Sequence, residues 1–121
     1  MPKTESTNPY RDLEVRTTEF AKMVIRLCKK LPSTTINRPL IDQIIRSSGS
    51  VGANYREANE AVGKKDFTYR IRIARKETKE TDHWLQLIEV ANPTIHGEIV
   101  PIAKEASELR SIFTSIHDKS L

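Results

Sequence analysis

Residues 47–61 read SSGSVGANYREANEA, and this stretch decides the fold. Its two glycines and three serines are typical of a loop, yet the segments on both sides look helical. Helical phase is kept through the stretch by positions 41, 44, 48, 51, 55, 58 and 62. Because a linker has no need to keep phase, we predict one continuous helix over residues 38–62. Each glycine costs a helix about 1 kcal/mol relative to alanine, so another element must pack against this thin segment and compensate.

Three further segments carry apolar residues at helical spacing. They cover residues 12–31, 66–91 and 99–117. Pro32 ends the first of them, and Asn92-Pro93 ends the second. Proline fits a helix without loss only in the first turn, so Pro101 predicts that the last helix begins near residue 99. The sequence therefore predicts an all-α protein with four helices.

The chain has the size and composition of one small helical domain. Of its 121 residues 30% are charged and 6% are aromatic, and only 4 are glycines and 6 are prolines. Its single cysteine, Cys28, has apolar neighbours on the first helix and is expected in the core. Because the sequence has no signal peptide and no apolar run of about 20 residues, we expect a soluble, cytoplasmic protein with no membrane partner.

A polar layer is predicted between the second and third helices. If these helices form an antiparallel hairpin that turns near Gly63, the small residues 47–49 lie against residues 77–79. Buried carboxylates need partners, and the candidates are the serine hydroxyls, Asn54, Arg56 and Arg70. The predicted structural layer comprises Ser48, Asn54, Glu57, Arg70, Glu77 and Glu80.

A basic stripe follows the third helix. Seven basic and two acidic residues lie from Lys64 to Lys79, so this segment carries +5 where the whole chain carries +4. At 100° per residue, four of the basic side chains fall within a sector of about 60°, and a fifth lies at its edge. These candidate nucleic-acid-binding residues are Lys65, Arg72, Lys76 and Lys79, with Arg75 at the edge. The stripe suits phosphates, and it is equally consistent with a solvated helix face.

The aromatic and apolar residues of the third helix exceed what one core stripe needs. Trp84 falls on the apolar side and is expected in the core or a subunit interface rather than as a stacking residue. The hydroxyl groups of Tyr55 and Tyr69 are expected to form hydrogen bonds near the polar layer. Tyr69 and Leu87 flank the core stripe on one side and Ile71 flanks it on the other. A second partner surface is therefore predicted, which makes the protein a homo-oligomer.

The sequence offers little for catalysis. Glu80 and His83 have the i, i+3 spacing of carboxylate-bridged di-iron bundles, but such sites need a second copy that this chain lacks. There is no glycine-rich phosphate loop and no Cys-His or Ser-His pair with readable spacing. We therefore expect a protein that is not an enzyme, with no catalytic residue, no metal and no cofactor.

Two long stretches together resemble a known bacterial family. SVGANYREANEA, residues 50–61, followed by DFTYRIRIARKETKETDHWLQLIEVA, residues 66–91, is similar to the proteins associated with intervening sequences of 23S ribosomal RNA. The specific part is Asn54-x-x-Glu57 combined with Lys76-Glu77-x-x-Glu80-x-x-x-Trp84-Leu85. Other members often have Asn-Ile-Ala-Glu-Gly in place of residues 54–58, and Gly-Ser in place of Lys76-Glu77.

The resemblance implies an antiparallel up-down-up-down four-helix bundle over residues 12–118, which leaves residues 1–11 as a flexible N-terminal segment. It also implies assembly as a ring-shaped homopentamer. The family is similar to the accessory protein of diversity-generating retroelements, a basic pentamer that works with reverse transcriptase and RNA. No enzymatic activity is established for the family.

Three functional hypotheses follow. The first is a non-enzymatic, homo-oligomeric scaffold that binds structured RNA, such as ribosomal RNA, through the basic stripe. The second is a structural module that binds another protein, such as a nucleic-acid enzyme, without binding nucleic acid. A carboxylate-bridged metal enzyme is a distant third.

Overall fold

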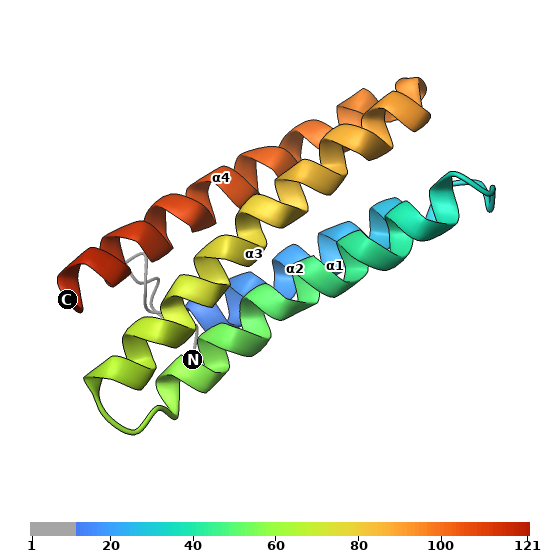
Figure 1. Cartoon of the computed structure of the whole chain (residues 1–121). Helices are drawn as coiled ribbons and strands as arrows, with labels where there is room; N and C mark the ends of the chain where they lie inside the picture. The colour runs from blue at the N-terminus through green and yellow to red at the C-terminus, as the bar shows by residue number, and fades with distance from the viewer. Residues whose placement is uncertain (1–11) are drawn as a thin grey trace, which may run out of the picture.

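Four long α-helices make up residues 12–121, the part of the chain that the computed structural model describes, and no strand occurs there. The helices are α1 (Leu13–Lys29), α2 (Asn37–Asn59), α3 (Lys64–Ala91) and α4 (His96–Lys119), with a 3-10 turn, Pro93–Ile95, just before α4. Each helix runs antiparallel to the one before it (Figure 1). The predicted all-α four-helix bundle is confirmed, and the expected flexible segment, residues 1–11, lies outside the described residues.

The stretch that looked like a loop is helical throughout. Residues 47–52 lie in the middle of α2, which runs unbroken from Asn37 to Asn59. The helix ends three residues earlier than predicted, so Val62 lies in the following corner with 91% of its surface exposed. Gly63 has φ +86°, a conformation that only glycine adopts without strain, and the predicted turn lies there.

The predicted start of the last helix near residue 99 was wrong. The turn Pro93–Ile95 continues directly into α4 at His96, so Pro101 lies inside the helix and beyond its first turn. Proline has no N–H, and one helical hydrogen bond is therefore missing. Ile99 and Ile102 are each only 3% exposed, and their packing holds this turn against the core.

The core is built from one apolar face of each helix. Its largest fully buried side chains include Phe20 of α1, Ile44 of α2, Leu85 of α3 and Phe113 of α4. Cys28 is buried among them, as expected, and burial raises the pKa of its thiol to about 11. Burying this much apolar surface supplies most of the free energy that holds the helices together.

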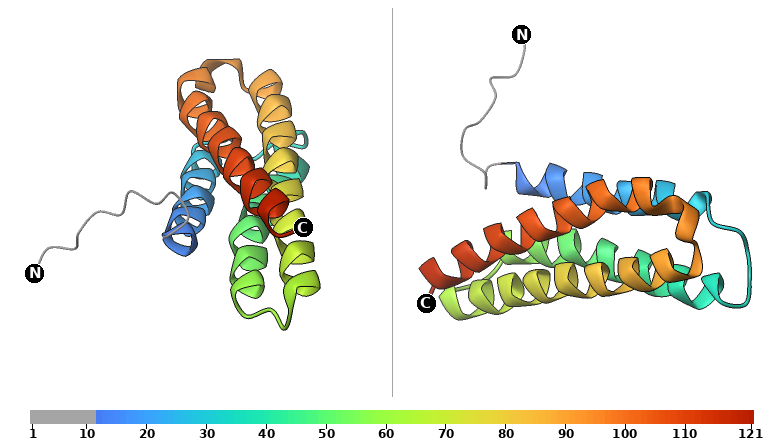
Figure 2. Two further views of the ribbon diagram at one scale, coloured as in Figure 1. Left: turned by 90° about the vertical axis from the view of Figure 1, so that its left-hand side faces the viewer. Right: turned by 90° about the horizontal axis from the view of Figure 1, so that it is seen from above.

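Each helix packs mainly against the helix that precedes or follows it in the chain. α2 and α3 make the most extensive contact, and α1 and α4 meet least closely. Both views in Figure 2 show that α1 and α3 lie apart from each other. Where α1 and α4 meet, Arg16 forms ion pairs with Glu105 at 2.7 Å and with Glu108 at 2.9 Å. These ion pairs connect the first helix to the last.

A buried amide pair joins two corners of the bundle. Asn37 begins α2 and Asn92 follows α3, and they are 2% and 9% exposed. The Asn37 amide donates to the Asn92 side-chain oxygen at 3.0 Å, and the Asn92 amide donates back at 2.9 Å. The end of the molecule opposite Gly63 is therefore fixed by two reciprocal hydrogen bonds.

No helix within residues 12–121 is both long and apolar enough to cross a membrane.

Candidate nucleic-acid interface

A groove of about 510 Å³ runs between α3 and α4, and we call it the basic groove. Its lining is Arg72, Arg75, Lys76 and Lys79 from α3, with Arg110 and Thr114 from α4. The groove thus gathers four of the five stripe residues predicted from the sequence. None of the described residues that line it is a carboxylate, so positive charge faces positive charge across the groove. Such an arrangement is stable only when water, or an anion, lies between the cations.

The helical repeat explains the α3 side of the groove. Residues 72, 76 and 79 are separated by four and three positions, which puts their side chains on one face of the helix. That face is turned away from the core: Arg72, Lys76 and Lys79 are exposed, and Arg75 is partly buried at its edge. The sequence pattern found this side correctly because one helix carries all of it.

Arg110 was missed in the sequence. It lies on α4, where it stands alone among residues that show no basic stripe. A signal did exist, because an antiparallel pairing of the last two helices around Asn92-Pro93 sets position 110 across from position 76.

Arg72 is held in place by a buried histidine. Its Nη2 and Nε lie 3.2 and 3.4 Å from Nε2 of His117, which is 8% exposed. A guanidinium can only donate, so Nε2 of His117 accepts, and the proton is on Nδ1, which donates to Asp118 at 3.2 Å. One cation of the groove is therefore positioned before any ligand arrives.

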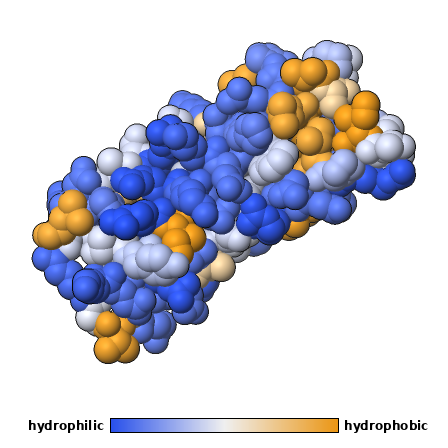
Figure 3. Space-filling model, viewed as in Figure 1, coloured by the Kyte–Doolittle hydropathy of each residue, from blue (hydrophilic) through white to orange (hydrophobic). Residues whose placement is uncertain are grey.

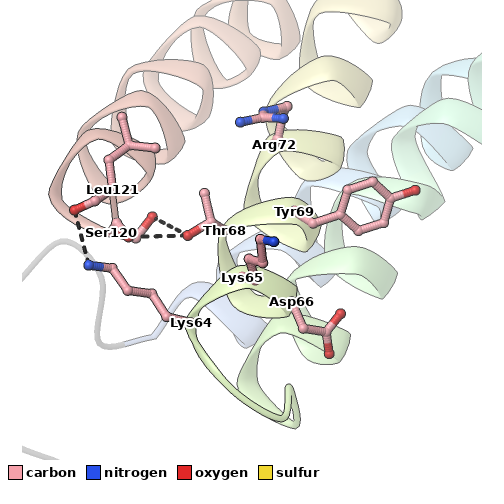
Figure 4. Close-up of a pocket in the computed structure, with 8 residues that line it drawn as sticks. All are labelled: Lys64, Lys65, Asp66, Thr68, Tyr69, Arg72, Ser120 and Leu121. Carbon is pink, nitrogen blue, oxygen red and sulfur yellow. Dashed lines mark hydrogen bonds between the residues drawn. The ribbon is translucent and has the colours of Figure 1, made fainter.

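A second hollow, the terminal pocket, adjoins the basic groove at Arg72. It encloses about 740 Å³. Its lining is Lys64, Lys65, Asp66, Thr68, Tyr69, Arg72, Ser120 and Leu121 (Figure 4). Lys65, the fifth residue of the predicted stripe, lies here and not in the basic groove. Three hydrogen bonds join its walls. Thr68 donates to the Ser120 hydroxyl at 2.8 Å and to the Ser120 carbonyl at 3.3 Å, and Lys64 donates to the Leu121 carbonyl at 3.0 Å.

Tyr69 lies on this outer surface, and the expectation that its hydroxyl serves the polar layer was wrong. The side chain is 54% exposed and lines the terminal pocket. The guanidinium carbon of Arg70 lies over the ring, 5.8 Å from its centroid. Tyr55, by contrast, is 9% exposed and packs on Phe113 with ring centroids 5.9 Å apart.

The polar layer between α2 and α3 has a different partner from the ones expected. Glu77 is 6% exposed, and its Oε2 lies 3.6 Å from Nη1 of Arg46. Nη2 of the same guanidinium forms an ion pair with Oε2 of Glu80 at 2.8 Å. Beside them, the hydroxyls of Ser47 and Thr81 share a hydrogen bond of 2.9 Å. The predicted hairpin register sets position 46 beside position 80, and this signal could have found Arg46.

The remaining predicted members of the layer lie elsewhere. Ser48 is buried, and its hydroxyl donates to the Ile45 carbonyl of its own helix at 3.4 Å. Asn54 accepts a 3.4 Å bond from Arg70, about two turns along α2 from Ser47. Glu57 is exposed and has no hydrogen bond or ion pair to the layer within residues 12–121. Arg56, a candidate partner, binds Glu14 of α1 instead.

Two buried polar atoms have no hydrogen-bond partner among the described residues: Oε1 of Glu77 and Nε1 of Trp84. Trp84 is partly buried and packs against the core. The neighbouring His83 is exposed, and the two rings form a T-shaped pair with centroids 4.8 Å apart.

Within residues 12–121 no three His, Cys, Asp or Glu side chains are grouped so that they could hold a metal ion.

The described residues thus form a small, antiparallel four-helix bundle with a basic groove between its last two helices. The family model described as 23S rRNA-intervening sequence protein matches residues 11–115, and the chain belongs to this family. It is similar to a solved structure of a protein with unknown function from the S23 ribosomal protein family of Bacteroides thetaiotaomicron VPI-5482. That similarity has a TM-score of 0.76 and 31% identity, and covers 87% of this chain and 97% of the other. No curated protein matches the chain.

Proposed function

We propose that this protein is a non-enzymatic, homo-oligomeric scaffold that binds structured RNA, such as ribosomal RNA, through the basic groove. The observation that carries the proposal is the convergence of five cationic side chains from two helices on one groove, with no carboxylate among the described residues that line it. Binding of phosphates is mainly electrostatic, and it grows with the number of phosphates that are neutralised together.

The chemistry of the groove favours phosphate over other anions. Three of its five cations are arginines, whose planar guanidinium groups donate two parallel hydrogen bonds to phosphate oxygens. The groove is also open and elongated along the helices, because Arg72 and Lys79 lie about two turns apart on α3. A backbone with regularly spaced phosphates suits this shape better than a single small anion.

The oligomer is supported by apolar side chains left on the surface. At the end where α3 passes into α4, hydrophobic residues gather on one face (Figure 3). Three apolar residues near this corner in the sequence, Leu87, Val90 and Val100, have 39%, 82% and 48% of their surfaces exposed. Ile71, which was expected to help form a partner surface, is fully buried in the core. The family resemblance implies a pentamer, and a ring would repeat the basic groove around one axis.

Charge reversal in the groove tests RNA binding. Lys76→Glu combined with Lys79→Glu is the variant of choice, because both side chains are exposed and neither forms a hydrogen bond or an ion pair with another residue within 12–121. The matched control is Lys29→Glu combined with Lys104→Glu, which changes the net charge equally on exposed positions outside the groove. The measurement is the mobility shift of a structured ribosomal RNA fragment at low salt.

We expect the groove variant to lose binding and the control variant to keep most of it. Equal binding by both variants would show that net charge, and not the groove, attracts RNA. A pulldown that recovers a protein but no nuclease-sensitive material would favour the alternative, a protein-interaction module, which the exposed apolar residues also suit. Light scattering decides the oligomer, because a monomer has a mass of 13.8 kDa.

A further inference from the structure

The terminal pocket differs in chemistry from the basic groove that it adjoins. It is lined by cations, as the groove is, but also by the Asp66 carboxylate, the Tyr69 ring, two hydroxyl residues and a leucine (Figure 4). At about 740 Å³ it is large enough for a ligand of nucleotide size. Arg72 lines both hollows, so one polyanion can pass from the groove into the pocket.

Tyr69 gives the pocket a flat stacking surface. Among the Phe, Tyr and Trp residues within 12–121 it is the one with an exposed side chain, and the core does not use its ring. Arg70 lies over the ring, and that guanidinium is itself restrained by Asn54 at 3.4 Å and Asp66 at 4.0 Å. The attraction between this cation and the ring restrains the ring in place.

We propose that the terminal pocket binds an unpaired nucleotide of the RNA, with its base stacked on Tyr69 and its phosphates on Lys65 and Arg72. This inference rests on the proposed function and adds a class of ligand to it. Bases inside an A-form helix are covered by their neighbours, so only an unpaired base can reach the ring. The bound RNA then has a single-stranded segment beside the structured part that occupies the basic groove.

The test compares two RNA hairpins that differ only in a single-stranded overhang. Tyr69→Ala should bind the overhang hairpin about 5- to 150-fold more weakly than the parent protein, which is the range for losing one stacked base. Its affinity for the blunt hairpin should be unchanged. Tyr69→Trp should keep the overhang preference, whereas Val15→Ala, an exposed apolar position on α1 outside the pocket and the groove, should have no effect. In the overhang, 2-aminopurine fluorescence should be quenched by the parent protein and not by Tyr69→Ala.

The possible failures are distinguishable. If Tyr69→Ala binds both hairpins as the parent does, while Lys76→Glu with Lys79→Glu loses both, the pocket inference is overturned and the basic groove stands. If the parent protein binds neither hairpin, the proposed function fails and the pocket inference fails with it. Because Tyr69 is half exposed, melting curves of its variants should match the parent curve, which excludes unfolding as the cause of weaker binding.

Discussion

Gly52 of α2 lies directly against Thr17 of α1. A Cβ atom at position 52 would be 2.9 Å from the Thr17 Oγ1 and 3.2 Å from its Cβ. Thr17 is fully buried, and its hydroxyl donates a 2.7 Å bond to the Leu13 carbonyl, so it has little room to move aside. The thin part of α2 therefore admits α1 at Gly52, whereas no atom of the described residues lies within 4 Å of a Cβ at Gly49.

Substitution of Gly52 should destabilise the protein although it removes a poor helix former. We expect Gly52→Leu to lower the free energy of unfolding by about 1–3 kcal/mol, because overpacking against Thr17 exceeds the gain in helix propensity. Gly49→Leu, with open space around it, should be neutral or stabilising by up to about 1 kcal/mol. Denaturant unfolding of both variants makes the comparison.

A double-mutant cycle isolates the cause. Gly52→Ala should cost more in the parent than in a Thr17→Ala background, where the closest atom, Oγ1, has been removed. Equal costs in the two backgrounds would mean that the contact with Thr17 is not the origin of the effect.

Arg46 should matter more than an ordinary surface arginine. Its removal leaves the buried Glu77 without its nearest cation, and we expect Arg46→Ala to lower the free energy of unfolding by about 1–3 kcal/mol. Arg46→Ala should cost less once Glu77→Gln has removed the charge. The control is Arg56→Ala, whose pair with Glu14 is exposed and should be worth less than about 1 kcal/mol. Similar losses for both arginines would argue against a special role for the buried carboxylate.

Cys28 should make stability fall at high pH. Burial raises its pKa from 9.0 to about 11, so the folded protein keeps the thiol proton over a range in which the unfolded chain releases it. The free energy of unfolding should therefore fall between pH 9 and 11, relative to Cys28→Ala, by about 2–3 kcal/mol in total. Denaturant melts of both proteins across this range measure the difference. A constant difference would show that the thiol titrates normally in the folded state.

Arg110 should contribute to RNA binding as much as the residues of α3. We expect Arg110→Ala to weaken binding of all sequences alike and to reduce the slope of log K against log salt by about 0.7–0.9, the value for one lost phosphate contact. Lys104→Ala, an exposed cation of the same helix outside the groove, should leave the slope unchanged. Titrations at several salt concentrations give both slopes. An unchanged slope for Arg110→Ala would remove this residue from the interface.

Most of the fold was predictable because it depends on periodicity along single helices. The helical spacing of apolar residues correctly predicted a helix through residues 47–52, although their composition is typical of a loop. The start of α4 was mispredicted because the expectation that proline lies in the first turn ignores tertiary packing. The burial of Ile99 and Ile102 stabilises the helix around Pro101. The neighbour of Gly52 was also missed, since helical phase shows which residues share a face but not which helix lies opposite.

The candidate site was predictable only as far as one helix carries it. The stripe of Arg72, Lys76 and Lys79 follows from their spacing, but Arg110 enters the groove from another helix. Arg46 shows the same limit for the polar layer, because its partners lie on α3. Exposure was the weakest inference: Tyr69 and Ile71 were both placed at a flank of the core, and one is 54% exposed while the other is fully buried.

The three faces of α3 restrict how the length of this chain can change in evolution. Leu85 faces the core, Glu77 faces α2, and Lys79 faces the basic groove. Because successive residues are 100° apart, deleting or inserting one residue in mid-helix would turn every later side chain by that angle. Lysines would enter the core, and the buried carboxylate would leave Arg46. Changes in length should therefore cost less at the corners than inside a helix. In the corner of residues 30–36 the helix faces do not depend on the count, and the local constraints are the hydrogen bonds from Asn37 to Pro32 and Thr34.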